Sequence, residues 1–191
     1  MVRVSTIGAV CLLLAACQQD GDGAASGNGA AAGQPASKSA EQGKQSIAES
    51  LAATSDHGRF VNALKAAGLD GTLSGAQPYT VFAPTDAAFE GIEGDGADAL
   101  LAPENKARLV ALLTGHIVPG VVTAEDLGKA IDRGKNKAQI ATVGGANLTF
   151  TRLGDGIAVS GPDGKQGRIS GPGKIQSNGA IHPIDIVLMA N

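Results

Sequence analysis

The chain has 191 residues, and its 15 Lys and Arg against 18 Asp and Glu give a formal net charge of −3. This slight acidity, without a basic stripe along the sequence, argues against nucleic-acid binding, which relies on clustered Lys and Arg. Trp is absent and only one Tyr and four Phe are present, too few to build exposed stacking platforms for bases or glycans. The core must therefore consist mainly of Leu, Val, Ile and Ala.

The N-terminus has the form of an export signal. Arg3 precedes an apolar run over residues 7–16, which is shorter than the roughly 20 apolar residues that span a bilayer. A positive start and a short apolar run predict a signal peptide over residues 1–16. The run ends Leu14-Ala15-Ala16-Cys17, which resembles a bacterial lipobox, and we expect Cys17 to receive the lipid. The alternative is an ordinary signal peptide with a cysteine there by chance.

Residues 17–43 are expected to be the lipidated cysteine and a flexible tether. They are rich in Gly, Ala, Ser and Gln, so they cannot bury enough apolar surface to offset the entropy of ordering. Cleavage before Cys17 would remove Cys11 and leave no partner for an intramolecular disulfide. Gln18 stands where an Asp favours inner-membrane retention in lipoproteins of this kind. We therefore expect an exported protein attached through Cys17 to the outer membrane, on its periplasmic or surface face.

A single domain is expected over residues 44–191, and it begins with helices. Apolar spacing predicts helices over residues 45–53 and 58–67, the second ending at Gly68, and residues 71–75 should form a connection. Residues 79–82 then form a short β-prone run that Pro84 should stop. Thr85 and Asp86 offer N-cap oxygens to a helix from residue 87.

The middle of the chain continues this alternation. Residues 91–96 form a glycine-rich acidic loop, for which a solvated loop is favoured over a cation site. Pro103 should open a longer helix that ends at Gly115, followed by a strand over residues 116–118 and a turn at Pro119-Gly120. Thr123 should cap a short helix that runs to residue 131.

The last third has the two-residue period of strands. Short β-prone runs at residues 140–143, 146–151, 157–159 and 174–177 are separated by glycine turns. Asn178-Gly179 signals another turn, and an apolar strand should follow to residue 189. Helices come first and strands later, which predicts an α+β fold.

The sequence shows no catalytic or metal-binding constellation. Gly167–Gly171 has its serine in the wrong place for a nucleophile elbow, and residues 127–130 lack most of a phosphate loop. His57, His116 and His182 have no His or Cys partner at ligand spacing. We therefore expect neither an enzyme nor a metal or other cofactor.

Four blocks in order carry a resemblance to a known family. They are residues 47–69, 79–89 (YTVFAPTDAAF), 112–120 (LLTGHIVPG) and 178–189 (NGAIHPIDIVLM). Together they resemble the fasciclin (FAS1) family, in the form of a bacterial single-domain fasciclin lipoprotein, with Gly115 where the family's Tyr-His element usually has Tyr. The resemblance implies a wedge of two small β-sheets with several α-helices packed on one side.

The resemblance also marks motif positions that are either structural or in contact with a partner. They are Thr80, Phe82, Pro84, Thr85, Asp86, Phe89, His116, Pro119, Gly120, Asn178, Gly179, His182 and Asp185. We expect Phe82 and Phe89 to anchor the core. For His116 and His182, burial with hydrogen bonds to Asp86, Asp185 or backbone carbonyls is favoured over a contact site, because each is flanked by apolar residues.

The family implies an interaction module for cell-surface adhesion or matrix contact, with an unidentified protein or matrix partner. Animal members bind integrins through the Tyr-His element and an acidic segment. Here Gly115 replaces the Tyr, and the aligned segment 171–175 (GPGKI) has no carboxylate, which argues against integrin binding. The alternative function is a periplasmic binder of a small apolar ligand or lipid, which a large apolar cavity would favour.

Overall fold

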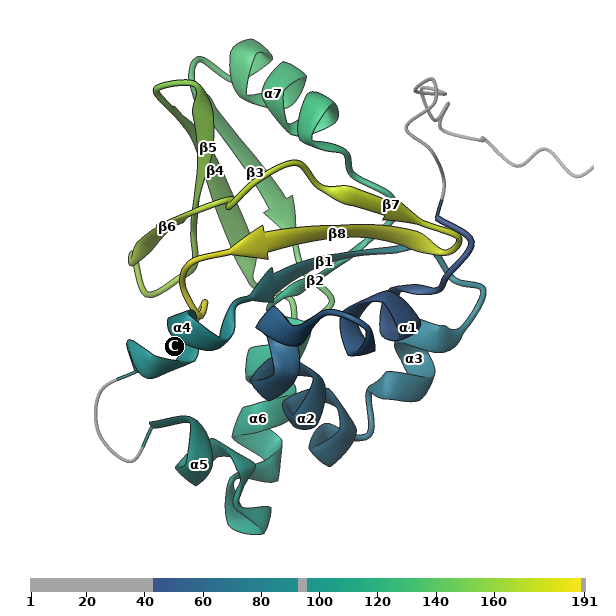
Figure 1. Cartoon of the computed structure of the whole chain (residues 1–191). Coiled ribbons are helices and arrows are strands. Elements are labelled where there is room, and N and C mark those ends of the chain that lie inside the picture. Colours follow the sequence, from purple (N-terminus) through teal and green to yellow (C-terminus); the bar gives the residue numbers. More distant parts are fainter. Residues whose placement is uncertain (1–42, 93–95, 190–191) are drawn as a thin grey trace, which may run out of the picture. The chain divides into compact units, whose positions relative to one another are not determined.

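The computed structural model describes residues 43–92 and 96–189 (Figure 1). Its helices are α1 (Ile47–Ala52), α2 (Gly58–Ala67), α3 (Asp70–Ser74), α4 (Asp86–Glu90), α5 (Gly96–Leu101), α6 (Lys106–Thr114) and α7 (Ala124–Arg133), with 3-10 turns at Ser55–His57 and Pro103–Asn105. Its strands are β1 (Tyr79–Pro84), β2 (Ile117–Pro119), β3 (Lys137–Ala141), β4 (Asn147–Leu153), β5 (Gly156–Ser160), β6 (Gln166–Arg168), β7 (Lys174–Gln176) and β8 (Gly179–Ile184).

The strands form two four-stranded sheets, which confirms the predicted α+β class. The first has the order β2-β1-β8-β7 and the second the order β3-β4-β5-β6. All neighbours are antiparallel except β1 and β8, which run parallel from the pair Tyr79 and Gly179 to the pair Pro84 and Ile184. This pairing brings the two sequence motifs side by side. Helices α1–α6 lie on one side of the first sheet, and the second sheet lies on its other side (Figure 1).

Two apolar cores lie on either side of the first sheet. The helix-side core includes Ile47, Leu51, Phe60, Leu64, Leu73, Val81, Ala83, Phe89, Leu112, Leu113, Ile117 and Ile181. The sheet-side core consists of Phe82, Val118, Leu127, Ile131, Ala138, Leu148, Phe150, Val159, Ile184 and Leu188. Strand β1 is buried on both faces, because Val81 and Ala83 face one core and Phe82 faces the other.

The helix boundaries follow the local signals closely. Helix α2 spans the predicted residues and ends at Gly68, which has the left-handed φ of 77° typical of a glycine C-cap. Helices α1 and α7 each begin with a capping box, formed by Ser46 with Glu49 and by Thr123 with Asp126. Helix α7 packs through Leu127 and Ile131 on the second sheet.

Several predicted elements were wrong. Residues 70–74 form helix α3 instead of a connection, because burial of Leu73 outweighs the low helix propensity of the flanking glycines. Strand β1 extends two residues beyond the predicted 79–82, and Pro84, which was predicted to stop it, is its last paired residue. Pro103 opens a 3-10 turn, and the α-helix begins only at Lys106.

The strand boundaries also differ from the prediction. Strand β3 begins at Lys137 and ends at Ala141, and β6 was not predicted. Strand β8 ends at Ile184, well before residue 189. The strand was predicted to run to residue 189 because the sequence stays apolar to that point. Residues 187 and 188 are buried, but they pair with no other strand. Burial, not pairing, explains their composition.

The predicted signal peptide (1–16), Cys17 and most of the tether lie outside the described residues, as do residues 93–95 of the acidic loop. Gly43, the first residue described, donates a backbone hydrogen bond to Ile175 on β7 (2.9 Å). None of the described helices is long and apolar enough to cross a membrane.

Candidate functional site

The motif residues of β1 and β8 meet in the centre of the first sheet. Phe82 is fully buried between the rings of Phe150 (centroids 5.1 Å apart) and His182 (5.4 Å). Phe89 is 4% exposed and belongs to the helix-side core. Both phenylalanines are therefore buried as predicted, but they belong to different cores.

Thr80 and His182 jointly fix the turn that follows β2. The Thr80 hydroxyl donates to the Gly120 carbonyl (2.7 Å) and accepts from the Val122 amide (2.8 Å). The His182 Nε2 lies 2.8 Å from the Val122 carbonyl, so this nitrogen must carry the proton and donate. Gly120 adopts a φ of 91°, which few other residues tolerate. Motif residues on β1 and β8 and directly after β2 thus act together to hold one turn.

His116 is a fully buried link between α6 and the chain after β8. Its Nδ1 donates to the Leu112 carbonyl (2.8 Å), and its Nε2 accepts from the Leu188 amide (3.0 Å). Burial lowers the pKa of His116 to about 4, against the smaller opposing effect of the Leu112 hydrogen bond. The ring is therefore neutral near pH 7, and the structure confirms the predicted hydrogen-bonded, buried state.

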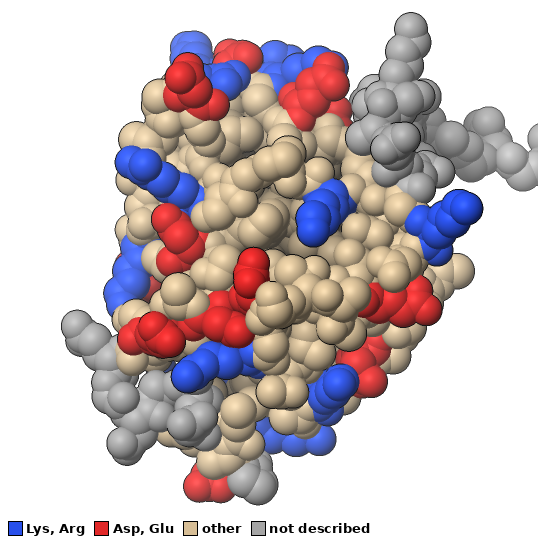
Figure 2. Space-filling model, in the orientation of Figure 1, with Lys and Arg blue, Asp and Glu red and all other residues tan. Residues whose placement is uncertain are grey.

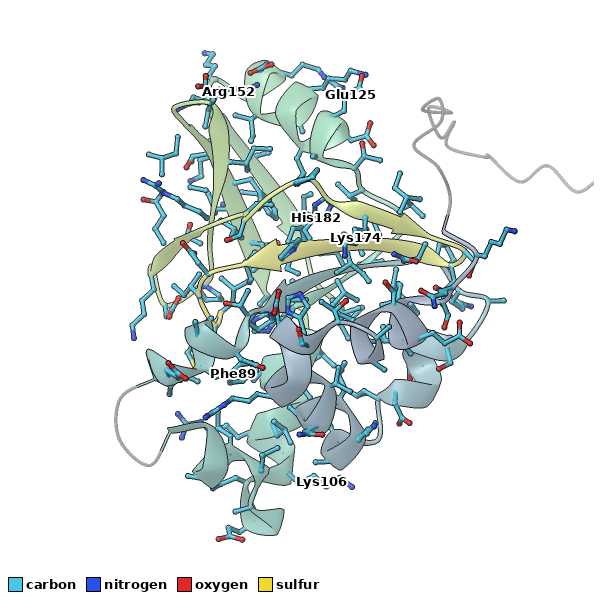
Figure 3. The ribbon with its side chains drawn as sticks, in the orientation of Figure 1. Phe89, Lys106, Glu125, Arg152, Lys174 and His182 are labelled. Carbon is cyan, nitrogen blue, oxygen red and sulfur yellow. The ribbon has the colours of Figure 1, made fainter. Side chains whose placement is uncertain are left out.

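The His182 ring has one unsatisfied nitrogen. Its Nδ1 is buried and has no hydrogen-bond partner in the described part of the chain, and a Cβ atom at Gly173 would collide with this side of the ring. Burial lowers the pKa of His182, while the bond to Val122 acts in the opposite direction. A neutral imidazole with Nδ1 as an unused acceptor fits these contacts. Figure 3 shows His182 on β8, with Lys174 nearby on β7.

The carboxylates predicted to serve the histidines make other bonds. Asp86 Oδ1 accepts from the Arg59 amide (2.8 Å) at the start of α2, where the helix dipole favours a negative charge. Asp185 Oδ1 accepts from the Arg168 amide (2.6 Å) on β6. Thr85 has extended N-cap geometry but no side-chain bond to α4. Only the predicted backbone acceptors were right, and Asp86 caps a neighbouring helix.

Asn178 is the most connected of the remaining motif side chains. Its Oδ1 accepts from the Ile47 amide, and its Nδ2 donates to the carbonyls of Leu73 and Gly75, each at 2.8 Å. The turn signal at this position therefore also joins α1 and α3 to the first sheet. The adjacent Gly179 has no room for a side chain against the Tyr79 carbonyl.

Two motif prolines have contrasting surroundings. The Pro84 carbonyl accepts from Nδ1 of His57, 3.0 Å away, a buried histidine whose partner the sequence did not indicate. Pro119 is exposed at the end of β2. Since Pro has no N–H to offer, it leaves this edge position unable to donate to another strand.

No reactive centre is evident among the described residues. They contain no group of three or more His, Cys, Asp or Glu placed to hold a metal ion. On the face shown in Figure 2, Lys and Arg are interspersed with Asp and Glu, without a basic stripe. One cavity of about 310 Å³ is lined by Ala87, Ala88, Gly91, Ile92, Lys165, Asp185, Ile186, Val187 and Met189. It is small and partly charged, unlike the large apolar cavity that an apolar carrier would need.

Residues 55–190 match the model of the Fasciclin domain family. The chain belongs to the fasciclin family. It is 34% identical over 153 residues to Protein sll1483 of Synechocystis sp., covering 80% of this chain and 78% of that one. It is 30% identical over 147 residues to human stabilin-1, covering 76% of this chain but only 5% of the much longer relative.

The fold of this fasciclin domain also matches a solved structure. The FAS1 domain pair from the insect cell adhesion molecule Fasciclin I superimposes with a TM-score of 0.68 at 18% identity, over 78% of this chain and 52% of that one. At this identity the likeness establishes the fold alone.

Proposed function

We propose that this fasciclin domain is a lipid-anchored, extracytoplasmic interaction module that serves surface adhesion or matrix contact. The observation that supports this is the inward orientation of the polar motif side chains. Thr80, His116 and His182 are at most 1% exposed and bond to the chain's own backbone. They therefore build a rigid scaffold, and a partner must be recognised by the exposed surface that this scaffold holds in place.

Adhesion can be tested together with folding on one variant. His116→Ala removes two buried hydrogen bonds, and unpaired buried groups cost about 1–3 kcal/mol each. We expect a lower melting temperature. Attachment of cells or of immobilised protein should decrease only in proportion to the fraction of protein that is unfolded. An unchanged melt with lost attachment would contradict this scaffold role and make His116 a direct contact.

Membrane attachment through Cys17 is the second part of the proposal. One acyl chain binds a membrane only marginally, whereas two or three hold it firmly. The tether of residues 18–43 would have a root-mean-square reach of roughly 30 Å as a random coil, which would hold the domain clear of the lipid headgroups.

The anchor is tested by Cys17→Ser, with Cys11→Ser as the matched control inside the signal. We expect Cys17→Ser to accumulate as unprocessed precursor that leaves the detergent phase, while Cys11→Ser is processed and partitions like the wild type. Wild-type partitioning of Cys17→Ser, with cleavage at the same bond, would rule out lipidation at this residue.

The partner is then sought among proteins that co-purify with the lipidated wild type. Mass spectrometry should find them depleted with Cys17→Ser, which lacks the membrane location. An integrin is not expected, because the exposed residues Gly171 and Pro172 offer no carboxylate to an integrin metal ion.

A further inference from the structure

The 310 Å³ cavity lies where the ends of the two sequence motifs meet. One wall comes from α4 and the residues directly after it, and the other from residues 185–189, after β8. The Thr85 amide donates to the Ile184 carbonyl (3.0 Å), which fixes the two segments against each other. Figure 1 shows the segment after β8 beside α4.

The floor of the cavity is aliphatic and firmly packed. Ala88 and Val187 are 7% and 4% exposed and belong to the helix-side core. Ile92 and Met189 pack against that core and remain partly exposed. Short side chains at positions 87 and 88 leave the space open, because larger ones would extend into it.

Two opposite charges line the same cavity. Lys165 comes from the loop before β6, and Asp185 directly follows β8. They form no ion pair with each other, since the described ion pairs are those of Lys129 with Glu125 and Arg152 with Asp132. The Arg168 amide holds one oxygen of the Asp185 carboxylate at 2.6 Å, which fixes the position of this charge.

We propose that this cavity binds a small aliphatic zwitterion of the class of the branched-chain amino acids. The ligand carboxylate faces Lys165, its ammonium group faces Asp185, and its aliphatic chain lies on Ala88, Val187 and Ile92. A purely anionic ligand would meet the Asp185 carboxylate, and a purely cationic one would meet the Lys165 amine, so charge complementarity selects a ligand with both charges. The volume is at the lower end of the about 300–1,000 Å³ of small-molecule sites, which suits a molecule of this size.

Titration calorimetry of the full-length chain in detergent tests the charge requirement with three probes that share one branched five-carbon aliphatic group. Leucine carries both charges, 4-methylpentanoate lacks the ammonium group, and 3-methylbutylamine lacks the carboxylate. Exposed ion pairs are each worth about two- to fivefold in affinity. We therefore expect saturable leucine binding, with each single-charge probe weaker by about two- to fivefold for the missing pair.

Three variants locate the site. Lys165→Gln should remove the advantage of leucine over the amine but keep its advantage over 4-methylpentanoate. Ala87→Leu, at an exposed position of the wall, should fill the space and abolish binding. Lys174→Gln, an exposed lysine on β7, is the matched control and should bind leucine like the wild type.

Each contrary result overturns the proposal. Absence of saturable leucine binding would mean that the cavity is not a site for this class, including the case in which the chain's own end fills it. Equal binding of leucine and 4-methylpentanoate would show an anion site, and equal effects of Lys165→Gln and Lys174→Gln would place binding elsewhere. The adhesion proposal would be unaffected, because it rests on the scaffold and the anchor.

Discussion

The helix-side and sheet-side cores share one wall but are built differently. The helix-side core takes most of its residues from the continuous stretch 47–117, which contains α1–α6, β1 and the start of β2, and of its buried residues only Ile181 and Val187 join it from later in the chain. The sheet-side core joins Phe82 to Phe150 and Leu148 on β4 and to Leu127 on α7, all much later in the chain. The first sheet therefore lies between two cores. The contacts of the helix-side core join residues that are mostly near one another in sequence, and those of the sheet-side core join residues far apart in sequence.

Each core is also lined by one buried histidine that links distant parts of the chain: His116 joins α6 to the segment after β8, and His182 joins β8 to the turn after β2. The ring of His116 lies 6.0 Å from that of Phe60, on the helix side, while His182 stacks on Phe82, on the sheet side. Both rings are neutral donors to backbone carbonyls. The family motifs therefore supply one buried polar link on each side of the first sheet, and substitutions in the two cores should act independently.

The largest effects should come from phenylalanine pairs that lie within one core or in different cores. Phe82→Ala, Phe89→Ala and Phe150→Ala should each cost about 3–5 kcal/mol, because each ring is buried. Phe82 and Phe150 are in contact, so their double variant should deviate from additivity, whereas Phe82 and Phe89 should be additive within about 0.5 kcal/mol. Denaturant titrations measure these energies.

The two-core description fails if the Phe82 and Phe89 effects couple as strongly as those of Phe82 and Phe150. Because the double variants could unfold completely, Phe→Leu substitutions at the same positions provide a milder cycle that keeps part of the burial. The same coupling pattern should appear with smaller energies.

The parts of this fold that the sequence predicts are those set by residues close to one another in the chain. Gly68 and the capping residue Thr123 act within one turn of chain, so the end of α2 and the start of α7 could be predicted, whereas α1 was predicted from residue 45 and begins only at Ile47, after the Ser46 cap. Helix α3 could not be predicted, because it depends on burying Leu73 in the helix-side core, where α3 packs on α1 and α2, and its own five residues carry no helical period. The short strand β6 depends on pairing with β5 and carries no apolar alternation of its own.

The next effect is a pH dependence carried by His116. Its pKa is about 6.5 in the unfolded chain and about 4 in the folded one, so the unfolded state binds the proton more readily. The contribution of His116 to the free energy of unfolding is therefore fully present above pH 6.5. It is lost as the pH falls towards 4, by about 1.4 kcal/mol per pH unit or about 3 kcal/mol in all. The lowered pKa of His182 adds a loss in the same direction. Urea titrations from pH 7 to pH 4 measure it.

His116→Gln is the control for this titration, since it keeps a donor and an acceptor but takes up no proton near neutrality. It should be less stable than the wild type at pH 7 and show a shallower pH dependence. Parallel curves for the two proteins would mean that His116 is not responsible and that carboxylates dominate the acid sensitivity.

A smaller effect, of about 1–3 kcal/mol, is expected for Gly173→Ala, because its methyl group would press on the His182 ring. The matched change is Gly128→Ala in α7, where the nearest atom to the new Cβ is an Arg152 nitrogen at 3.5 Å. There the better helix propensity of Ala should stabilise by about 0.5–1 kcal/mol. Opposite signs for one chemical change would show that the sheet-side core is tightly packed at His182; equal signs would contradict it.

The candidate site was predicted less well than the fold. The sequence indicated that His116 and His182 are buried and bonded to carbonyls, because apolar neighbours reveal burial. It could not show that Asp86 serves α2, because that contact joins residues 27 positions apart. The position of Lys165 in the cavity was not predicted for the same reason. The opposite wall comes from α4, and nothing in the sequence around Lys165 indicates that the two segments lie close together.

The smallest effect concerns how α7 is held over the sheet-side core, and two neighbouring acids separate the possibilities. Glu125 pairs with Lys129 on the exposed face of the helix, and this pair raises the pKa of Lys129. Asp126 instead accepts hydrogen bonds from the Thr123 amide (3.2 Å) and hydroxyl (2.7 Å). Exposed ion pairs contribute little, because water and salt screen them, so Glu125→Gln should leave the melting curve unchanged within error. Asp126→Ala breaks the capping box and should cost about 0.5–1 kcal/mol. A larger loss for Glu125→Gln than for Asp126→Ala would mean that surface charge, and not the cap with the buried Leu127 and Ile131, fixes α7 on the second sheet.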